Sequence, residues 1–249
     1  MIAGYQNEIN FINYLNKKKY KQVNILFQEM LKQLYPEIKL EDTIKAYKYG
    51  KYAKVDIVIN VNGVEKGISV KCGINNSVHL EPIDRFVLYL ENLGFSNKDK
   101  LLRYLYSDGT NNNTGNIRRS SSEYKEENEK DIIEINNELR KIEFYLINRF
   151  LIKTEVNYRV TVDMFIVGYV DDFLWALKEE VLEYLIKIEQ NSSGVHVSNL
   201  FIQNWNKNLK YNPKYEHCRG YIQVKWYSIL EDIIMIIIFR NNNNIEISG

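Results

Sequence analysis

The stretch Lys54-Val-Asp-Ile-Val-Ile-Asn-Val61, Asn62-Gly63, Val64-Glu-Lys-Gly-Ile-Ser-Val-Lys-Cys72 consists of two runs rich in β-branched residues around a turn dipeptide. Such runs favour strands, and Asn-Gly is the strongest short signal for a β-hairpin. A two-residue turn at Asn62-Gly63 places Val61 opposite Val64 and so sets the register of the two strands. The sequence therefore predicts an antiparallel hairpin over residues 54–72.

This register divides the hairpin into two faces. It places Asp56 opposite Ser69, and because side chains alternate along a strand, Lys71 lies diagonally across on the same face. A slip of one residue would separate Asp56 from Lys71. We expect the apolar face to meet the core and the polar face to be open to solvent. The polar face carries Lys54, Asp56, Asn60, Ser69 and Lys71, and the apolar face carries Val55, Ile57, Ile59, Val61, Ile68 and Val70.

The polar residues of the hairpin have two interpretations. A carboxylate and an ammonium that meet on a sheet can form a simple cross-strand ion pair, worth about 0–1 kcal/mol at an exposed site. The second interpretation follows from the spacing, which is Asp56, twelve residues, then Ser69-Val70-Lys71. This pattern within a hydrophobic hairpin resembles the PD-(D/E)xK nuclease superfamily, the fold of many restriction enzymes, resolvases and DNA-repair nucleases. The resemblance covers about residues 5–95.

The resemblance implies an α/β (α+β) fold in which a mixed central sheet is flanked by helices, with an additional C-terminal half of helices and strands. It places Asp56 at the first acid of the motif, Lys71 at its lysine, and Glu8 at the acid of an N-terminal helix. Ser69 stands where the motif has its second acid, and a hydroxyl is a poorer ligand of Mg²⁺ than a carboxylate. Glu8 and Glu81 are the nearest acids that could replace it.

By this resemblance the catalytic residues are Asp56, Lys71, Glu8 and Ser69. Asp56, Glu8 and the Val70 carbonyl would hold Mg²⁺, with Mn²⁺ as a substitute, and Lys71 would position or deprotonate the attacking water. The implied activity is hydrolysis of DNA phosphodiester bonds by a restriction or phage-defence endonuclease, and a homodimer would suit cutting of both strands. The alternative is a catalytically silent protein that keeps the nuclease fold to bind nucleic acid or a protein partner. Ser69 favours this alternative, whereas a Glu8 close to Asp56 would favour the enzyme.

The composition limits the other classes of function. The 249 residues, 45% of them hydrophobic, are enough for one large domain or two small ones. A net charge of +1 means that any DNA-binding surface must be a local patch. Cys72 and Cys218 are too few for a Cys-rich zinc framework, and we expect reduced thiols. The chain shows no signal-peptide pattern, and its longest apolar run, Ile233 to Phe239, is too short to span a bilayer, so we expect a cytoplasmic protein without membrane contact.

Two polar segments are expected to contact DNA. The first is the loop Cys72–Glu81, where polar side chains can bind phosphate oxygens or satisfy turn backbone: Asn75, Asn76, Ser77 and His79. The second is the basic connector Asn206–Arg219, which carries Lys207, Lys210, Lys214 and Arg219.

A second motif, Gln223-Val224-Lys225, rivals the hairpin, because some nucleases of the superfamily use Gln-x-Lys in place of Glu-x-Lys. No Asp lies at the proper distance before it on a matching strand. The other interpretation is that Gln223 and Lys225 are ordinary outward-facing residues of a strand.

A long polar segment divides the chain. Residues 1–106 form the nuclease-like core, residues 107–131 a mobile polar loop, and residues 132–249 a C-terminal half that we expect to pack into the same composite domain. Apolar periodicity predicts helices over residues 5–16, 20–34, 82–93, 132–151 and 171–189. Strands are predicted over residues 43–48, 158–169, 200–205 and 221–226.

Overall fold

The structure, a computed structural model, divides into two compact units, each built from segments that are separated in the sequence. Unit 1 contains Met1–Asn76, Leu151–Tyr184 and Ser228–Gly249, and unit 2 contains Ser77–Phe150 and Leu185–Tyr227. The residues that the structure describes are 3–50, 53–73, 76–106, 125–153, 159–188, 194–204 and 220–247. Each unit has its own sheet.

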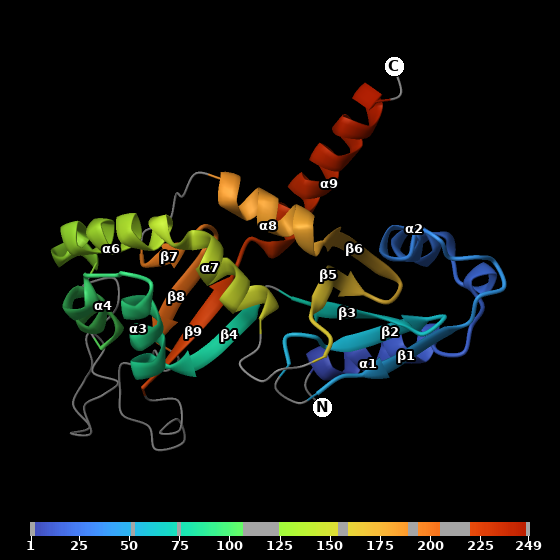
Figure 1. The fold of residues 1–249 in the computed structure, drawn as a ribbon, viewed down its shortest axis with the longest axis horizontal. Helices are drawn as coiled ribbons and strands as arrows, with labels where there is room; N and C mark the ends of the chain where they lie inside the picture. Colours follow the sequence, from blue (N-terminus) through green and yellow to red (C-terminus); the bar gives the residue numbers. More distant parts are fainter. Residues whose placement is uncertain are drawn as a thin grey trace. The chain divides into compact units, whose positions relative to one another are not determined.

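Unit 1 is built on a five-stranded mixed sheet in the order β1-β2-β3-β5-β6 (Figure 1). Strands β3 and β5 are parallel, and every other neighbouring pair is antiparallel. The predicted α/β class with a mixed sheet flanked by helices is therefore confirmed. The strands are β1 Ile44–Lys48, β2 Ile57–Val61, β3 Val64–Lys71, β5 Val162–Tyr169 and β6 Asp172–Leu177.

The hairpin has the predicted register. Val61 pairs with Val64, and Ile57 pairs with Ile68. Asn62 and Gly63 both have positive φ, 52° and 86°, as a tight two-residue turn requires. Its apolar face packs into the core, because Ile57, Ile59, Val61, Ile68 and Val70 all belong to one buried cluster.

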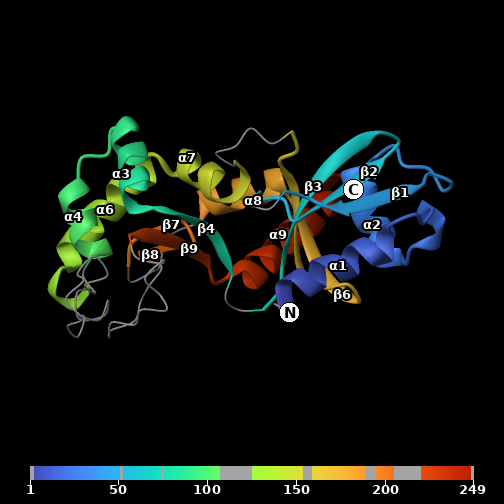
Figure 2. The same cartoon turned by 90° about the horizontal axis from the view of Figure 1, so that it is seen from below.

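Helices α1 (Ala3–Leu15) and α2 (Ile25–Leu34) contribute to that cluster and cover one face of the sheet (Figures 1 and 2). The Phe11 ring of α1 lies 5.9 Å from Phe27 of α2 and 5.3 Å from Phe173 of β6, measured between ring centroids. A short 3-10 helix, Tyr20–Gln22, connects the two helices, and Asn24 caps α2 by accepting a hydrogen bond from the Phe27 N–H. Packing of these apolar faces fixes α1 against the strands that carry the polar residues.

The polar face of the hairpin is less open than predicted. Ser69 is only 3% exposed, and Val58 on the same face is fully buried. The reason is that β5 pairs with β3 and sets Phe165 beside Ser69, while helix α9 (Ile229–Ile247) contacts β5 and β6. The polar side chains of Asp56 and Lys71 stay partly exposed at one end of this face, as do Asn60 and Glu65 at the turn end.

Gly67 allows β5 to approach β3. A Cβ at this position would lie 2.1 Å from the carbonyl oxygen of Thr161, which is too close for any side chain. The Gly67 N–H instead donates to Asp163 Oδ2 at 2.8 Å. The pairing of the two strands shifts register between Gly67 and Ile68, as a β-bulge does.

Unit 2 contains a four-stranded antiparallel sheet in the order β4-β9-β8-β7. Its strands are β4 Ser77–Pro82, β7 His196–Val197, β8 Leu200–Asn204 and β9 Tyr221–Trp226, and its helices are α3 Ile83–Asn92, α4 Lys98–Leu105, α6 Glu129–Lys141 and α7 Glu143–Ile147. Helices α3 and α7 lie to one side of the strands (Figure 2). The strand positions that face the core, Leu200, Ile202, Ile222, Val224 and Trp226, are fully buried.

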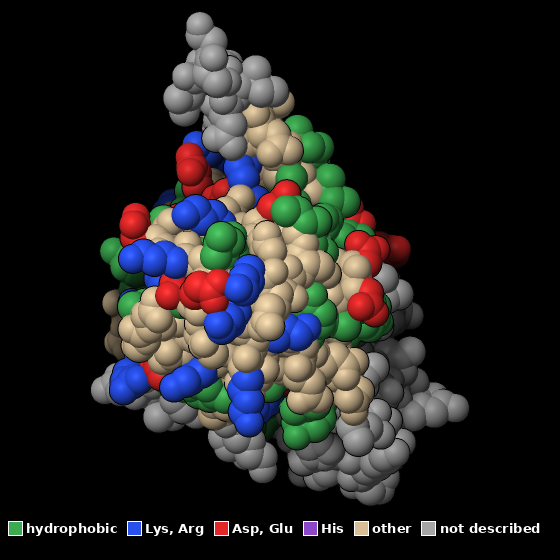
Figure 3. Space-filling model, turned by 90° about the vertical axis from the view of Figure 1, so that its right-hand side faces the viewer, with side chains coloured by type: hydrophobic (Ala, Val, Ile, Leu, Met, Phe, Trp, Pro, Cys, Tyr) green, Lys and Arg blue, Asp and Glu red, His purple; other side chains and the backbone are tan. Residues whose placement is uncertain are grey.

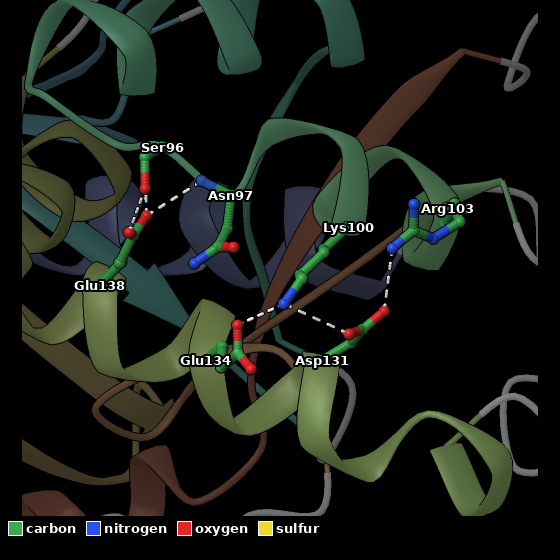
Figure 4. Close-up of polar contacts among 7 residues, drawn as sticks. All are labelled: Ser96, Asn97, Lys100, Arg103, Asp131, Glu134 and Glu138. Carbon is green, nitrogen blue, oxygen red and sulfur yellow. Dashed lines mark hydrogen bonds and ion pairs between the residues drawn. The ribbon is translucent and has the colours of Figure 1, made fainter.

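Polar contacts join helices α4 and α6 in unit 2 (Figure 4). Lys100 contacts Asp131 at 3.4 Å and also pairs with Glu134, and Arg103 donates to Asp131 at 3.0 Å. The Glu138 carboxylate accepts hydrogen bonds from the backbone N–H groups of Ser96 and Asn97, next to the start of α4. These contacts hold α4 and the two residues before it against α6.

Three predicted segments are corrected by the structure. The helix predicted over residues 171–189 begins only at Lys178, because Asp172–Leu177 forms β6 in a hairpin with β5. The helix predicted over residues 132–151 is broken into α6, α7 and a π-helix at Asn148–Ile152. The loop predicted over Cys72–Glu81 contains strand β4. Short apolar runs fit a strand or a helix equally well, and pairing partners decide between them.

Other predictions fall partly outside the described residues. Residues 107–124 of the predicted mobile loop are not described, and residues 129–131 belong to α6. The basic connector at residues 206–219 is also not described. Among the described residues, no helix combines the length and hydrophobicity needed to cross a bilayer.

On the side of the molecule shown in Figure 3, Lys and Arg side chains lie beside Asp and Glu side chains. The basic run after α1 follows the same rule: Lys19 and Lys21 pair with Glu41, and the Lys18 ammonium lies 3.5 Å from the centre of the Tyr14 ring. These lysines are engaged by neighbouring side chains of unit 1.

Candidate active site

Asp56 is the centre of the polar end of the hairpin. Its Oδ2 accepts hydrogen bonds from the Ser69 hydroxyl at 3.2 Å, the Val70 N–H at 2.7 Å and the Lys71 ammonium at 3.1 Å. The Asp56 N–H donates to the Ile68 carbonyl at 2.9 Å, which holds the start of β2 against β3. The Asp56 and Lys71 side chains are 19% and 18% exposed. The structure thus brings together the three residues that the hairpin register placed on one face.

The Lys71 ammonium lies between two oxygen atoms. It reaches Asp56 Oδ2 at 3.1 Å and the Val70 carbonyl oxygen at 3.4 Å. All three hydrogen bonds to the Asp56 carboxylate end at Oδ2, so among the described residues Oδ1 has no hydrogen-bond partner. One carboxylate oxygen and one carbonyl oxygen therefore converge where a cation is already favoured.

Glu8 on α1 pairs with a second lysine, Lys48, at the end of β1. Their side chains are 13% and 36% exposed. Burial lowers the pKa of Lys48, while the charge of Asp56 acts to raise it and the charge of Lys71 acts to lower it. The charges of Asp56 and Lys71 therefore both act on Lys48, which also pairs with Glu8. The four side chains comprise two carboxylates and two ammonium groups.

Asn7 fixes the helix that carries Glu8. Its side chain is buried, and its Nδ2 donates to the Gly168 carbonyl of β5 at 2.8 Å. The Asn7 Oδ1 is also buried, and it has no hydrogen-bond partner among the described residues. Nothing in the sequence singles out Asn7 beyond its place beside Glu8, and Lys48 is one of several lysines interspersed with tyrosines at residues 47–54.

The oxygen atoms at this end of the hairpin suit a hard divalent cation. Mg²⁺ is usually held by one or two carboxylates and keeps several waters. Asp56 has a carboxylate and Val70 a carbonyl at this end, whereas the Glu8 carboxylate contacts Lys48. The described residues contain no group of three His, Cys, Asp or Glu side chains that could hold a metal. Ser69 is a buried hydrogen-bond donor to Asp56, so its contact orients that carboxylate.

The residues predicted to bind DNA after Lys71 lie in other surroundings. Asn76 is buried and donates to the Gly73 carbonyl at 3.0 Å, which satisfies turn backbone. Ser77 accepts a hydrogen bond from Gln223 at 3.2 Å. His79 is buried and contacts Glu81 at 2.8 Å. The others, Asn75, Lys207, Lys210, Lys214 and Arg219, lie outside the described residues.

Glu81, a candidate for the missing acid, belongs to a buried polar cluster of unit 2. Burial raises the pKa of its carboxyl, but hydrogen bonds from His79 and Arg149 outweigh burial and hold that pKa below the usual range. The Arg149 guanidinium binds both carboxylate oxygens and lies 4.1 Å from the centre of the Tyr89 ring. All partners recorded for Glu81 thus lie within unit 2, and none belongs to the hairpin.

Comparison with solved structures shows a likeness in fold. No protein-family model matches the chain, and no curated protein matches its sequence. The fold is similar to that of the restriction endonuclease MspI, in a crystal structure of its complex with its cognate DNA, with a TM-score of 0.51 and 12% sequence identity. The alignment covers 89% of this chain and 88% of that chain. The fold is therefore restriction-endonuclease-like.

Proposed function

We propose that this protein is a metal-dependent nuclease that hydrolyses DNA phosphodiester bonds at the end of the β2–β3 hairpin. The observation that carries the proposal is the Lys71 ammonium held between Asp56 Oδ2 and the Val70 carbonyl, at 3.1 and 3.4 Å. These are the groups that the motif order Asp, then Ser-Val-Lys, assigns to metal and water. The likeness to a restriction endonuclease bound to its cognate DNA supports the choice of substrate.

The side chains have distinct proposed roles. Asp56, Glu8 and the Val70 carbonyl hold one Mg²⁺, which Mn²⁺ can replace, and water completes the coordination. The bound ion would polarise the phosphate and stabilise the charge that develops on it. Lys71 orients the attacking water and offsets negative charge on the phosphate oxygens. Ser69 keeps the Asp56 carboxylate in place through the 3.2 Å hydrogen bond.

The biological version of this activity that we favour is a restriction or phage-defence endonuclease. Such enzymes cut both strands of a duplex, and two copies related by a two-fold axis present two sites to the two strands. We therefore propose that the protein acts as a homodimer on duplex DNA. Sedimentation of the free protein and of its DNA complex measures this directly.

A second candidate function is a catalytically silent nuclease fold that binds DNA. Two observations favour it: Ser69 replaces the second acid, and both remaining acids are paired with lysines, Asp56 with Lys71 and Glu8 with Lys48. Under this alternative the ammonium groups take the place of the metal permanently.

Cleavage assays separate the two candidates. Plasmid, phage and single-stranded DNA are incubated with the protein in Mg²⁺, in Mn²⁺ and in EDTA, with Lys71→Ala and Glu8→Gln as variants. We expect metal-dependent cutting that is lost in Lys71→Ala and that needs more metal in Glu8→Gln. Intact DNA in every condition, with DNA binding retained by all proteins, would establish the silent fold.

A further inference from the structure

The second face of the unit 2 sheet is partly exposed along β9. Along β9 the side chains alternate between buried and partly exposed, so Tyr221, Gln223 and Lys225 lie opposite the core. Cross-strand pairing adds Leu80 beside Gln223, Gln203 beside Gln223, and Phe201 beside Lys225. Within residues 77–82, 200–204 and 221–226, no position on this face is acidic.

Lys225 is the notable charge on this face. Its side chain is partly buried, and burial alone lowers its pKa. No carboxylate among the described residues pairs with it, in contrast to Lys48, Lys66 and Lys71, which all have acid partners. A lysine that loses water without gaining an anion is unfavourable for the free protein, and an anionic ligand would restore the balance.

A chain of hydrogen bonds orders the polar side chains next to Lys225. The Tyr227 hydroxyl donates to Gln203 Oε1 at 3.5 Å, Gln203 Nε2 donates to Gln223 Oε1 at 3.1 Å, and Gln223 Nε2 donates to the Ser77 hydroxyl at 3.2 Å. Each amide NH₂ carries two hydrogens, and each bond in this chain uses one. Gln223 is partly exposed, so its second amide hydrogen is a further donor on this face, and phosphate oxygens accept from such donors.

Aromatic rings and a second cation lie on the same side of β8. The Phe201 and Tyr227 rings are 6.2 Å apart between centroids, and Tyr227 is exposed. The Lys125 ammonium lies 4.9 Å from the centre of the Phe201 ring, and burial lowers its pKa as well. Protein surfaces that bind DNA are polar and positively charged, and the strand positions of this face carry a lysine and no acid.

We propose that this face of unit 2, defined by Phe201, Gln223, Lys225 and Tyr227, binds the sugar-phosphate backbone of duplex DNA. The inference rests on the proposed function, because a nuclease needs a surface that holds the duplex while the hairpin cuts. Charge complementarity selects the occupant: Lys225 binds a phosphate, Gln223 donates beside it, and the rings contact sugars. The Gln223-Val224-Lys225 motif is then a DNA-binding element and not a rival catalytic site.

The test measures DNA binding apart from cleavage. Fluorescence anisotropy with a labelled duplex in EDTA compares the wild-type chain with Lys225→Met, which keeps the apolar stem and removes the charge. Losing one phosphate contact should weaken binding about fivefold to tenfold at 0.1 M salt and reduce the salt slope by about one. Lys225→Arg should restore most of the affinity. Lys130→Met, which removes an exposed lysine of α6 in the same unit, should change affinity less than about twofold.

The outcomes distinguish the proposed DNA-binding face from the proposed nuclease activity. The proposed DNA-binding face is wrong if Lys225→Met binds duplex DNA as tightly as wild type, or if the substitution weakens binding of single-stranded DNA more than binding of duplex DNA. Either result leaves the nuclease proposal standing. Weakened binding in Lys225→Met together with a chain that never cuts DNA supports the face and overturns the nuclease. A wild-type chain that binds no DNA overturns both. Circular dichroism on each variant excludes a loss of fold as the cause.

Discussion

Replacing Lys48 with methionine should tighten the binding of divalent metal. Lys48 pairs with Glu8, which we propose as a metal ligand, and it is electrostatically coupled to Asp56. A metal ion that uses Glu8 must displace the Lys48 ammonium and then tolerate its positive charge nearby. Methionine keeps the length of the side chain and removes both costs.

The expected size follows from the exposure of the pair. The Lys48 side chain is 36% exposed, so solvent screens the ion pair, and such a pair contributes at most about 1 kcal/mol. Because 1.4 kcal/mol corresponds to a tenfold change in affinity, the dissociation constant for Mg²⁺ or Mn²⁺ should fall by up to about fivefold. Screening by salt should reduce this gain as the ionic strength rises.

Titration calorimetry with Mn²⁺ in the absence of DNA measures the effect without reference to cleavage. Lys45→Met is the matched control, because Lys45 is an exposed lysine of the same strand. Among the described contacts, no ion pair involves Lys45. We expect tighter binding in Lys48→Met only. Unchanged or weaker metal binding in Lys48→Met would refute the assignment of Glu8 as a ligand, and an equal gain in both variants would reduce the effect to net charge.

Two further predictions concern stability. Ser69→Ala removes the 3.2 Å hydrogen bond to Asp56 and should lower the free energy of unfolding by about 1 kcal/mol in urea denaturation. DNA cleavage should be weakened but not lost. Complete loss of cleavage would show that Ser69 itself is essential. Glu81→Gln breaks a buried ion pair with Arg149 and should cost about 3 kcal/mol near neutral pH. The folded state lowers the pKa of Glu81, so the ionised carboxylate stabilises the fold above the unfolded pKa, and this stability is lost as pH falls through the folded pKa. The difference in unfolding free energy between wild type and Glu81→Gln should therefore shrink below about pH 4. A difference that stays constant from pH 7 to pH 3 would contradict this account of Glu81.

The hairpin could be predicted from the sequence because its determinants are local. The Asn62-Gly63 turn fixed the register, and alternation then placed Asp56, Ser69 and Lys71 together, as the structure confirms. The partners of the hairpin could not be predicted. β5 joins β3 from far along the chain and covers the Ser69 face, so the burial of that residue depends on tertiary contacts.

The same limit applies to the site residues outside the hairpin. Glu8 could be placed on a helix, but its ion pair with Lys48 depends on how α1 packs against β1. Strand β6 was assigned to a helix because Phe173 to Leu177 is a short apolar run that fits either structure. His79 looked like a loop residue, and the pairing of β4 with β9 buries it. In each case the sequence shows the local pattern of apolar residues but not the element that packs against it.

The most direct test of the account compares two aspartates of the same sheet. Asp56 and Asp163 each accept a hydrogen bond from a lysine, at 3.1 and 3.2 Å, and from a backbone N–H, at 2.7 and 2.8 Å, but only Asp56 lies beside the Val70 carbonyl in the proposed site. The measurement is the rate of plasmid cleavage in Mg²⁺ by wild type, Asp56→Asn and Asp163→Asn, with circular dichroism to show that all three are folded. The account predicts a loss of at least about a hundredfold in Asp56→Asn and a change of less than a few fold in Asp163→Asn. Cleavage by Asp56→Asn at the wild-type rate, or an equal loss in both variants, would contradict it.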